Sequence, residues 1–388
     1  MQPPCNSLYD GVSTEEKFPL EINVCETCWH SQLACVPSNM ERLFRNYPYR
    51  TGVSQTLVNH YRGLANHIKE YIDIPITKVL DIGCNDGTLL KNFVSSSTTY
   101  GIDPWKVEGV DVVVDNFIQR YWDKFTSAQL QGRQFEVITA TNVLAHNTNP
   151  KKFLQLAVPH LDWEGIMVLE FPYSRDLIEH VEFDTIYHEH VSYFNANSFW
   201  KLLEGTGLYV QYIEIIEVHG GSLRVFLSRC HPTEENKYHT GNLSAIIAKE
   251  KSLGLHSVRP YDEFSDKVEQ LRYDVQTLCS DMLRRQRILC GFGASGKSSV
   301  FLNYTSLPLK FIVDETPAKI GKFSPGWHVP IVGLDYLMQE AGPLDIFIFA
   351  WNCLSECLDK LRLMRDPTID DQYIIYVPKL EFRKLHGF

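Results

Sequence analysis

The stretch VLDIGCNDGTLL, residues 79–90, decides the fold of the first half of the chain. An apolar run leads directly into a loop that holds Gly83 and Gly87, and a helix-like pattern follows the loop. Glycine allows a backbone to approach a ligand closely, and the carboxylate of Asp81 can order the loop or bind a ligand ammonium group. The stretch therefore predicts a strand, a ligand-binding turn and a helix.

A second acid ends the next predicted strand, YGIDP at residues 100–104. Asp103 follows the glycine loop by about twenty residues, the spacing at which an acidic side chain reaches a ribose diol in doubly wound folds. The loop offers no clean cradle for a pyrophosphate, because acids repel phosphates and suit a zwitterionic sulfonium ligand. This pattern resembles the class I methyltransferases that use S-adenosylmethionine (SAM). We therefore predict a SAM site formed by Asp81, Gly83, Asn85, Asp86, Gly87, Asp103 and Asn142.

The composition limits the class of protein. The 388 residues, of which 44% are hydrophobic and 22% charged, predict roughly two or three globular domains. No stretch approaches the roughly 18 apolar residues of a membrane helix, and a net charge of -10 argues against nucleic acid as the main partner. The start MQPPCNSLYDG lacks a secretion signal, and ten cysteines without regular spacing favour reduced thiols. We therefore expect a cytoplasmic protein, monomeric or weakly homo-oligomeric.

Three segments follow one another along the chain. Residues 1–60 hold few periodic apolar runs and are expected to form a small irregular module. Residues 61–230 alternate apolar runs with helical patterns, which predicts crossover units and a largely parallel sheet. Residues 231–388 begin with polar helical patterns and then alternate again, so we predict a second, Rossmann-like α/β domain.

The segment FDTIYHEHVSYF, residues 183–194, combines groups suited to acid–base chemistry. Histidine is the usual general base near neutral pH, tyrosine can stabilise an enolate, and glutamate can orient an imidazole. Alternatives are a zinc site on the H-x-H pair, or histidines with ordinary structural hydrogen bonds. His146 at the end of another predicted strand and the glycine pair of VHGGSLRV, residues 218–225, favour a ligand site, with Arg224 as a candidate anion contact.

Taken together, these motifs resemble the sugar C-methyltransferases that act on nucleotide-linked deoxysugars, of the type that makes tetronitrose. The resemblance covers nearly the whole chain, and its most specific part is Y-H-E-H followed by H-G-G-S-L-R. The matching stretches are PLEINVCETCWHSQL (19–33), YPYRTGVS (47–54), VLDIGCNDGTLL (79–90), YGIDP (100–104), TNVLAH (141–146), FDTIYHEHVSYF (183–194), HGGSLRVF (219–226), GFGASGKSSVFLNY (291–304), FIVDETPAKIGKFSPGWHVPI (311–331) and FAWN (349–352).

The resemblance implies a zinc-binding N-terminal module, a central SAM domain and a C-terminal domain that helps to hold a nucleotide sugar. It also implies removal of the C3 proton beside a 4-keto group, followed by attack of the enolate on the SAM methyl group. In that mechanism His190 is the base and Glu189 orients it, Tyr187 and His146 lie near the keto oxygen, and Tyr49 or Tyr47 closes the pocket. The expected contacts to the nucleotide-diphosphate sugar are Tyr47, His188, His219, Gly220, Gly221, Ser222, Arg224, Gly291, Gly293, Lys297 and Asp314.

The N-terminal module departs from the family pattern. The family has two cysteine pairs, whereas this chain has only Cys25 and Cys28 as a pair, and Cys5 replaces a small residue after two prolines. A closed zinc site needs four ligands, for which His30 and Cys35 are further candidates. Zinc therefore stays an open alternative.

The stretch GFGASGKS, residues 291–298, fits both a P-loop and a dinucleotide-type turn. A P-loop nucleotidase also needs a strand that ends in a magnesium-binding aspartate. Asp314 ends the next predicted strand at the dinucleotide-type spacing, whereas Asp345 begins its strand. We therefore favour a turn near the nucleotide-sugar diphosphate or a purely structural turn. The alternatives are a P-loop ATPase or kinase that uses Lys297, and a binding protein that has lost catalysis.

Overall fold

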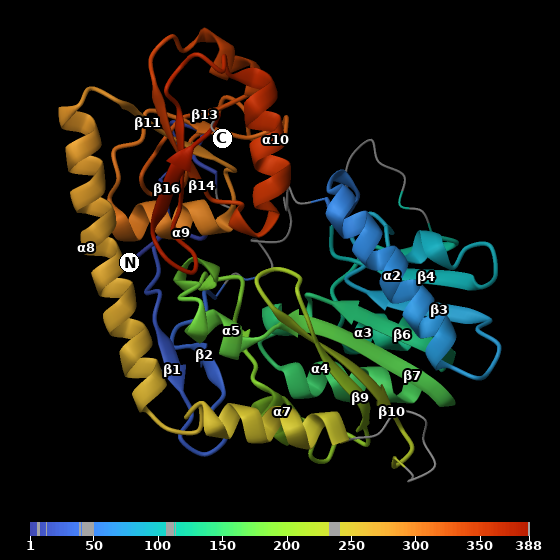
Figure 1. Ribbon diagram of the computed structural model, residues 1–388. Helices are drawn as coiled ribbons and strands as arrows, with labels where there is room; N and C mark the ends of the chain where they lie inside the picture. Colours follow the sequence, from blue (N-terminus) through green and yellow to red (C-terminus); the bar gives the residue numbers. More distant parts are fainter. Residues whose placement is uncertain are drawn as a thin grey trace.

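The computed structural model describes residues 1–388 with the exception of 6–7, 13, 39, 41–49, 106–111, 113, 233–240 and 387–388. It contains two mainly parallel sheets with helices packed on them and one small N-terminal sheet (Figure 1). The predicted α/β architecture is confirmed. Among the described residues, no helix is both long enough and apolar enough to cross a bilayer.

The central sheet has seven strands in the order β5-β4-β3-β6-β7-β10-β9. Neighbouring strands from β5 to β7 run parallel, while β10 runs antiparallel to both β7 and β9. The strands are β3 (Lys78–Ile82), β4 (Thr98–Ile102), β5 (Asn116–Ile118), β6 (Phe135–Thr141), β7 (Leu161–Pro172), β9 (Tyr209–Ile216) and β10 (Ser222–Ser228). Because β3, β4 and β6 are parallel neighbours, their carboxyl ends meet at one edge of the sheet, where ligands of such folds bind.

Amphipathic helices cover the central sheet. In α2 the buried residues Leu57, Leu64 and Ile68 recur at helical spacing, and the Ser54 side chain caps the first turn. The helices of this region are α2 (Gln55–Tyr71), α3 (Lys124–Gln129), α4 (Pro150–Ala157), α5 (Ser174–Glu179) and α6 (Ala196–Leu202). Short 3-10 turns are η1 (Thr51–Val53), η2 (Leu90–Asn92), η3 (Leu144–His146), η4 (Val158–His160) and η5 (Phe183–Thr185).

The small N-terminal sheet includes a strand from the central region. β1 (Ile22–Val24) pairs with β2 (Ser31–Leu33), and β2 pairs antiparallel with β8 (Ser192–Tyr193). Since β8 belongs to the histidine-rich segment, this pairing attaches the N-terminal module beside that segment.

The C-terminal sheet has the order β13-β12-β11-β14-β15-β16, with β16 antiparallel to its neighbour. Its strands are β11 (Ile288–Phe292), β12 (Ile312–Val313), β13 (Ile331–Val332), β14 (Leu344–Ile348), β15 (Gln372–Ile375) and β16 (Glu381–Lys384). Its helical elements are α9 (Gly296–Thr305), η6 (Leu334–Gln339), η7 (Trp351–Cys353) and α10 (Leu354–Met364).

Two helices connect the sheets. α7 (Gly241–Ser252) packs on the central region, where Glu250 accepts hydrogen bonds from Tyr173 Oη at 2.8 Å and from Ala196 N at 2.6 Å. α8 (Arg259–Arg284) then runs from the N-terminal sheet, where Tyr261 stacks on Trp29, to the C-terminal sheet (Figure 1). The boundaries at residues 60 and 230 stay predictions.

Candidate active site

The glycine loop after β3 is held against β4. The backbone N–H groups of Gly83 and Cys84 both donate to the Ile102 carbonyl, at 2.7 and 3.2 Å. Gly83 has φ 81°, and a Cβ on it would lie 2.2 Å from Val143 Cγ2. Both the left-handed backbone and the lack of space therefore require glycine here. The result is a tight turn at the carboxyl edge of the sheet, as the sequence predicts.

Two buried carboxylates face this turn. Asp103 Oδ2 accepts from Asn85 N and Asp103 Oδ1 from Trp105 N, both at 2.9 Å, while Asp81 Oδ1 accepts from Thr139 Oγ1 at 2.7 Å. Burial raises the pKa of Asp103 to about 6. Burial also raises the pKa of Asp81 to about 7, with a further contribution from the charges of Asp103 and Glu170. The edge thus concentrates negative charge that a cationic ligand would stabilise, which fits the ammonium and sulfonium groups of SAM.

The other two polar residues of the loop hold a neighbouring chain segment. Asn85 Oδ1 accepts from Thr51 N at 3.0 Å, and Asp86 Oδ2 accepts from Gly52 N at 2.9 Å. The side chains of Asn85 and Asp86, which we expected to bind the cofactor, therefore fix η1 over the loop. Thr51 and Gly52 are residues that the sequence pattern did not single out.

Asn142 follows β6 at the same edge. Its φ is 57°, and its N–H donates to the Glu170 carbonyl at 2.7 Å. Tyr47 and Tyr49, the predicted pocket-closing residues, lie outside the described residues.

The imidazole of His190 is half-buried, and both of its ring nitrogens are engaged. Nδ1 lies 2.9 Å from the Thr185 carbonyl, which can only accept, so Nδ1 carries the proton. Burial and the neighbouring His146 hold the pKa of His190 well below its usual value. In the resulting neutral ring Nε2 is an acceptor, and the Tyr187 hydroxyl donates to it at 2.9 Å, with the two rings stacked 4.0 Å apart. His190 is thus held in the state that a general base requires.

His146 lies beside this pair, with its ring centroid 4.8 Å from that of His190. His146 Nδ1 donates to the Glu189 carbonyl at 2.7 Å. Burial lowers the pKa of His146, although the carbonyls of Glu189 and Asn142 favour its protonated form. The structure therefore brings the predicted residues His146, Tyr187 and His190 together.

Glu189 has a different role from the one expected. Its side chain is fully buried and its Oε2 accepts from Cys5 Sγ at 3.1 Å. The acceptor that orients the His190 ring is the Thr185 carbonyl, so the assignment of Glu189 as the orienting partner does not match this geometry. Similarly, His188 Nε2 donates to the Pro19 carbonyl at 3.1 Å, which places that ring against the N-terminal segment.

The glycine pair makes room for two carboxylates. Gly220 and Gly221 have φ values of 95° and 128°. A Cβ on Gly220 would lie 2.5 Å from Glu182 Oε2, and a Cβ on Gly221 would lie 2.0 Å from Asp176 Oδ2. The sequence predicted that the backbone at these glycines lies close to a ligand. In the structure it lies close to two carboxylates of the protein instead. Beside the pair, Ser222 Oγ donates to the Val218 carbonyl at 2.9 Å.

A charged cluster lies where this loop faces α9. Burial raises the pKa of Glu182 to about 8, and burial together with the charge of Lys297 lowers the pKa of His219 to about 4. Burial also lowers the pKa of Lys297, although the nearby charges of Asp184 and Glu182 favour its protonated form. The charge of Lys297 thus acts on both His219 and Glu182, which come from the central region.

Arg224 does not match its expected role as an anion contact. Its Nε donates to Glu170 Oε1 at 2.6 Å and its Nη1 donates to Glu214 Oε1 at 2.8 Å. His60 and His67 contact the same two carboxylates, at 2.8 and 3.3 Å. The guanidinium is therefore neutralised within the sheet, where it holds β7, β9 and β10 together.

The GFGASGKS turn has the geometry of a structural turn. Asp314 Oδ2 accepts from Ala294 N at 2.8 Å and from Lys319 Nζ at 3.1 Å. Gly291 accommodates the Phe349 ring, because a Cβ there would lie 2.4 Å from Phe349 Cε2. Gly293 has φ 95°, a backbone conformation that favours glycine.

The two P-loop groups are engaged elsewhere. Lys297 Nζ lies 3.7 Å from the centroid of the Trp351 ring and donates to Asn352 Oδ1 at 2.7 Å. Ser298 is buried, and its hydroxyl donates to the Ser295 carbonyl at 2.7 Å. Asp345, at the start of β14, pairs with Arg287 at 2.8 Å. Because the Ser298 hydroxyl and the Asp345 carboxylate, which would bind magnesium, are engaged in these contacts, the geometry argues against a magnesium–triphosphate site.

Comparisons with known proteins agree with this geometry. Residues 41–213 match the family model of a methyltransferase domain, and residues 217–378 match that of the C-methyltransferase C-terminal domain. The chain is a SAM-dependent C-methyltransferase. Its fold is a class I methyltransferase domain followed by a second, C-terminal α/β domain with a mainly parallel sheet.

A curated relative and two solved structures are similar to this methyltransferase. The C-methyltransferase NovU from Streptomyces niveus is 29% identical over 364 residues, which cover 90% of this chain and 84% of the relative. Magnesium protoporphyrin IX methyltransferase (ChlM) from Synechocystis PCC 6803 with bound SAM is 15% identical and covers 45% of this chain and 79% of its own, with a TM-score of 0.33. The plantazolicin methyltransferase BpumL in complex with SAH is 16% identical and covers 43% and 82%, with a TM-score of 0.34.

The residues considered for zinc in the methyltransferase do not converge. Within the part of the chain that the structure describes, no three His, Cys, Asp or Glu side chains are grouped so that they could hold a metal ion. Cys25 and Cys28 lie in the turn between β1 and β2, where the Cys25 N–H donates to the His30 carbonyl at 2.8 Å. Cys5 instead contacts Glu189, away from this turn. The geometry of the described residues does not support the zinc alternative.

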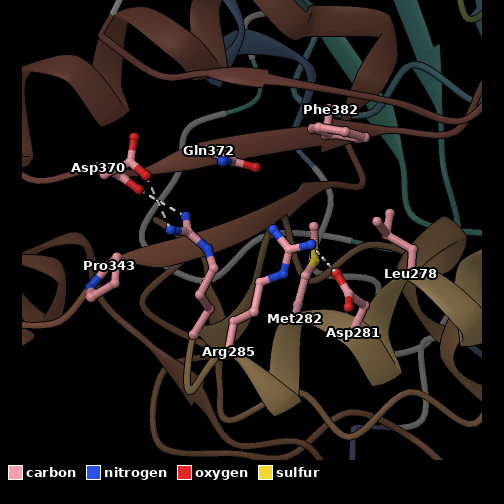
Figure 2. A pocket seen from close by; sticks show the side chains of 9 residues that line it. Leu278, Asp281, Met282, Arg285, Pro343, Asp370, Gln372 and Phe382 are labelled. Carbon is pink, nitrogen blue, oxygen red and sulfur yellow. Dashed lines mark hydrogen bonds and ion pairs between the residues drawn. The ribbon is translucent and has the colours of Figure 1, made fainter.

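A hollow of about 380 Å³ lies at the amino end of the C-terminal sheet (Figure 2), and we do not assign it to the active site. Its lining includes residues that directly precede strands, Pro343 before β14 and Arg287 before β11, together with residues of α8. This is the amino end of the parallel sheet, whereas ligands of such sheets bind at the carboxyl end. Its arginines are also paired, Arg285 with Asp281 at 2.7 Å and Arg287 with Asp370 at 3.4 Å.

Proposed function

We propose that this methyltransferase methylates C3 of a nucleotide-linked 4-keto-6-deoxysugar. The observation that carries the proposal is the half-buried, neutral His190 with its Nε2 lone pair beside Tyr187. A base held in this way suits a carbon acid, and the C–H next to a ketone is the kind of carbon acid that an imidazole can deprotonate. The match to a C-methyltransferase C-terminal domain and the similarity to NovU support carbon as the acceptor atom.

In the proposed mechanism His190 is the base and Tyr187 is the hydrogen-bond donor to the keto oxygen. The Tyr187 hydroxyl turns from Nε2 toward the keto oxygen, and the freed Nε2 takes the C3 proton. Tyr187 then stabilises the enolate oxygen by hydrogen bonding. His146 is less suited to this donation, because in its neutral form the only ring proton is already donated to the Glu189 carbonyl. When bound, SAM supplies an electrophilic methyl group on a cationic sulfur.

The SAM site is proposed at the carboxyl edge of β3 and β4. Asp81 is the candidate partner for the ammonium group and Asp103 for the ribose hydroxyls. The Gly83 turn supplies the space for close approach. These roles rest on the excess of buried negative charge that a cation would stabilise.

Lys297 is the proposed contact to the substrate diphosphate. The overall charge of -10 means that an anionic substrate must be held by local cations and backbone dipoles. Lys297 lies in the first turn of α9, where the helix dipole also favours an anion. The charge of Lys297 also acts on His219. The nucleotide-sugar partner is proposed on these grounds.

A mass-spectrometric assay tests the function. The protein is incubated with SAM and a panel of 4-keto nucleotide sugars, and we expect a mass gain of one methyl group on at least one of them. His190→Ala should retain SAM binding and reduce methyl transfer by about 10²- to 10⁴-fold, the usual contribution of a general base. His231→Ala, a variant of an exposed histidine, is the matched control and should retain activity. Full activity of His190→Ala would remove His190 as the base.

Two further readouts separate the alternatives. Exchange of the C3 proton for deuterium in the absence of SAM reports deprotonation directly, and it should disappear in His190→Ala. A protein that has lost catalysis would give no methyl transfer with any 4-keto sugar, and absence of SAM binding by calorimetry would remove the cofactor site itself.

A further inference from the structure

Asp184 links the central region to the C-terminal domain. This residue of η5 is fully buried, and its Oδ2 accepts from Trp351 Nε1 at 2.8 Å and from Tyr376 Oη at 2.6 Å. Trp351 belongs to η7, and Tyr376 directly follows β15. A single carboxylate oxygen thus holds two aromatic side chains of the other domain.

The same turn orients His190. Asp184 is followed directly by Thr185, whose carbonyl accepts from His190 Nδ1 at 2.9 Å. The turn is closed by Thr185 N and Thr185 Oγ1, which both donate to the Glu182 carbonyl, at 3.0 and 2.7 Å. Because η5 is only three residues long, a shift of the Asp184 anchor moves the carbonyl that holds the imidazole.

We propose that Asp184, Trp351 and Tyr376 are positioning residues that fix the His190 ring through the Thr185 carbonyl. The inference rests on the proposed function, since it assigns a task to the base named there. It adds that the C-terminal domain, beyond any contact to the substrate, sets the orientation of a catalytic imidazole in the central domain. None of the three residues stood out in the sequence as a site residue.

The surroundings of the anchor make it sensitive to the loss of either donor. Asp184 Oδ1 is buried without a hydrogen-bond partner among the described residues, so Oδ2 makes all the hydrogen bonds of this carboxylate that the structure describes. Trp351 is also fixed on its face, where Lys297 Nζ lies 3.7 Å from the ring centroid. A buried acid that loses a donor must move, take up a proton or recruit water, and each change disturbs η5.

The test uses conservative variants of the full chain. Tyr376→Phe removes one donor, Trp351→Phe removes the other and keeps an aromatic ring, and Asp184→Asn keeps the shape of the acceptor. Tyr304→Phe and Trp327→Phe are matched controls, because their polar groups bond to Glu269 and to the Leu307 carbonyl within the C-terminal region. Circular dichroism and thermal unfolding establish that each variant is folded. If Asp184→Asn does not fold, Tyr376→Phe and Trp351→Phe still test the proposal.

The first readout is the tautomer of His190, measured by NMR on protein with 15N-labelled histidine and assigned with His190→Gln. The wild type should show the Nδ1–H tautomer, and the three variants should show averaging with the Nε2–H tautomer. The second readout is kcat, which should fall by on the order of 10²-fold, the effect of a small misplacement of a catalytic group. The Kd for SAM should remain within twofold in all three variants, and KM should remain within twofold in Tyr376→Phe, which leaves the Trp351 ring and the Asp184 charge beside Lys297 in place. Both controls should resemble the wild type.

Retention of a single Nδ1–H tautomer in all folded variants would overturn the proposal, as would equal losses of kcat in the controls. These outcomes differ from a failure of the proposed function. If the wild type transferred no methyl group to any keto sugar, the tautomer measurement would still decide whether the C-terminal domain positions the imidazole.

Discussion

Asp103 accepts the backbone N–H of Asn85 at 2.9 Å, so the acid at the end of β4 holds the loop that follows β3. Its second oxygen accepts from Trp105 N, also at 2.9 Å. The carboxylate thereby shapes both sides of the proposed SAM site before any ligand arrives.

Asp103→Ala should weaken SAM binding, because it removes both the loop anchor and the proposed ribose contact. Loss of a charged acceptor costs about 1.5 to 3 kcal/mol, or about 10- to 100-fold in affinity. Isothermal titration calorimetry measures the change. Asp123→Ala is the control, since Asp123 caps α3 through Phe125 N and Thr126 N and should affect only stability, by about 1 kcal/mol. Unchanged SAM affinity in Asp103→Ala would place the ribose elsewhere.

SAM affinity should rise with pH between about 5.5 and 8. In the free protein the pKa of Asp103 is raised to about 6 and that of Asp81 to about 7, in both cases mainly by burial. A proton therefore occupies these carboxyls at lower pH, whereas an ammonium group or a ribose hydroxyl binds the ionised form. Binding must release that proton, so affinity increases by up to about tenfold per pH unit for each proton released and levels off above the raised pKa.

Calorimetry at pH 6 in two buffers of different ionisation enthalpy measures the released protons directly. Asp81→Asn should lose part of the pH dependence, because the group with the higher pKa no longer titrates. A dissociation constant that stays flat from pH 5.5 to 8 in the wild type would show that neither carboxyl binds SAM in its ionised form.

The sequence predicted the elements of this site better than their contacts. A short run such as VLDIG identifies a strand and a tight turn because the constraints are local, apolar burial and positive φ at Gly83. The carboxyl edge of a parallel sheet then follows from topology, which is why Asp81, Asp103 and His146 were placed correctly at that edge.

Contacts between distant segments could not be predicted in this way. Glu189 lies next to His190 in sequence, yet its side chain bonds to Cys5, which lies 184 residues away. Asp184 meets Tyr376 across 192 residues. Gly220 and Gly221 indicated close approach correctly, but residue type alone does not show whether a ligand or a carboxylate fills the space. A weak signal did exist, because FDT lies only one residue before the Y-H-E-H motif.

Arg224→Met should destabilise the protein without changing substrate affinity. It leaves Glu170 and Glu214 without their guanidinium partner, and Glu170 is almost fully buried. Removal of one member of a buried ion pair costs about 3 to 5 kcal/mol, and the remaining histidine contacts should keep the loss near the lower value. Denaturant unfolding measures the change. Lys201→Ala, which breaks an exposed pair with Glu204, should cost less than about 1 kcal/mol.

An anion-binding role for Arg224 gives the opposite pattern. In that case KM for the nucleotide sugar would rise while the free energy of unfolding stayed the same. Measuring both quantities on the same preparations of Arg224→Met and Lys201→Ala distinguishes the two roles.

The wild type should neither bind ATP more tightly with magnesium than without it nor hydrolyse it, despite the complete P-loop pattern of residues 291–298. The Ser298 hydroxyl, which would bind the metal ion, donates to the Ser295 carbonyl, and the Lys297 ammonium group lies on the Trp351 ring. Asp345 is paired with Arg287 at the opposite edge of the sheet. Nucleotide titration with and without magnesium, together with a phosphate-release assay, checks this expectation.

Lys297→Met completes this test. The methionine side chain keeps much of the apolar contact with Trp351 but removes the charge, so KM for the nucleotide sugar should rise by about tenfold, as expected for the loss of roughly one charge-assisted contact. Because the proposed SAM site lies at β3 and β4, which belong to another sheet, the Kd for SAM should not change. Magnesium-dependent nucleotide binding that disappears in Lys297→Met would instead identify residues 291–298 as a working P-loop and would move the proposed diphosphate contact away from α9.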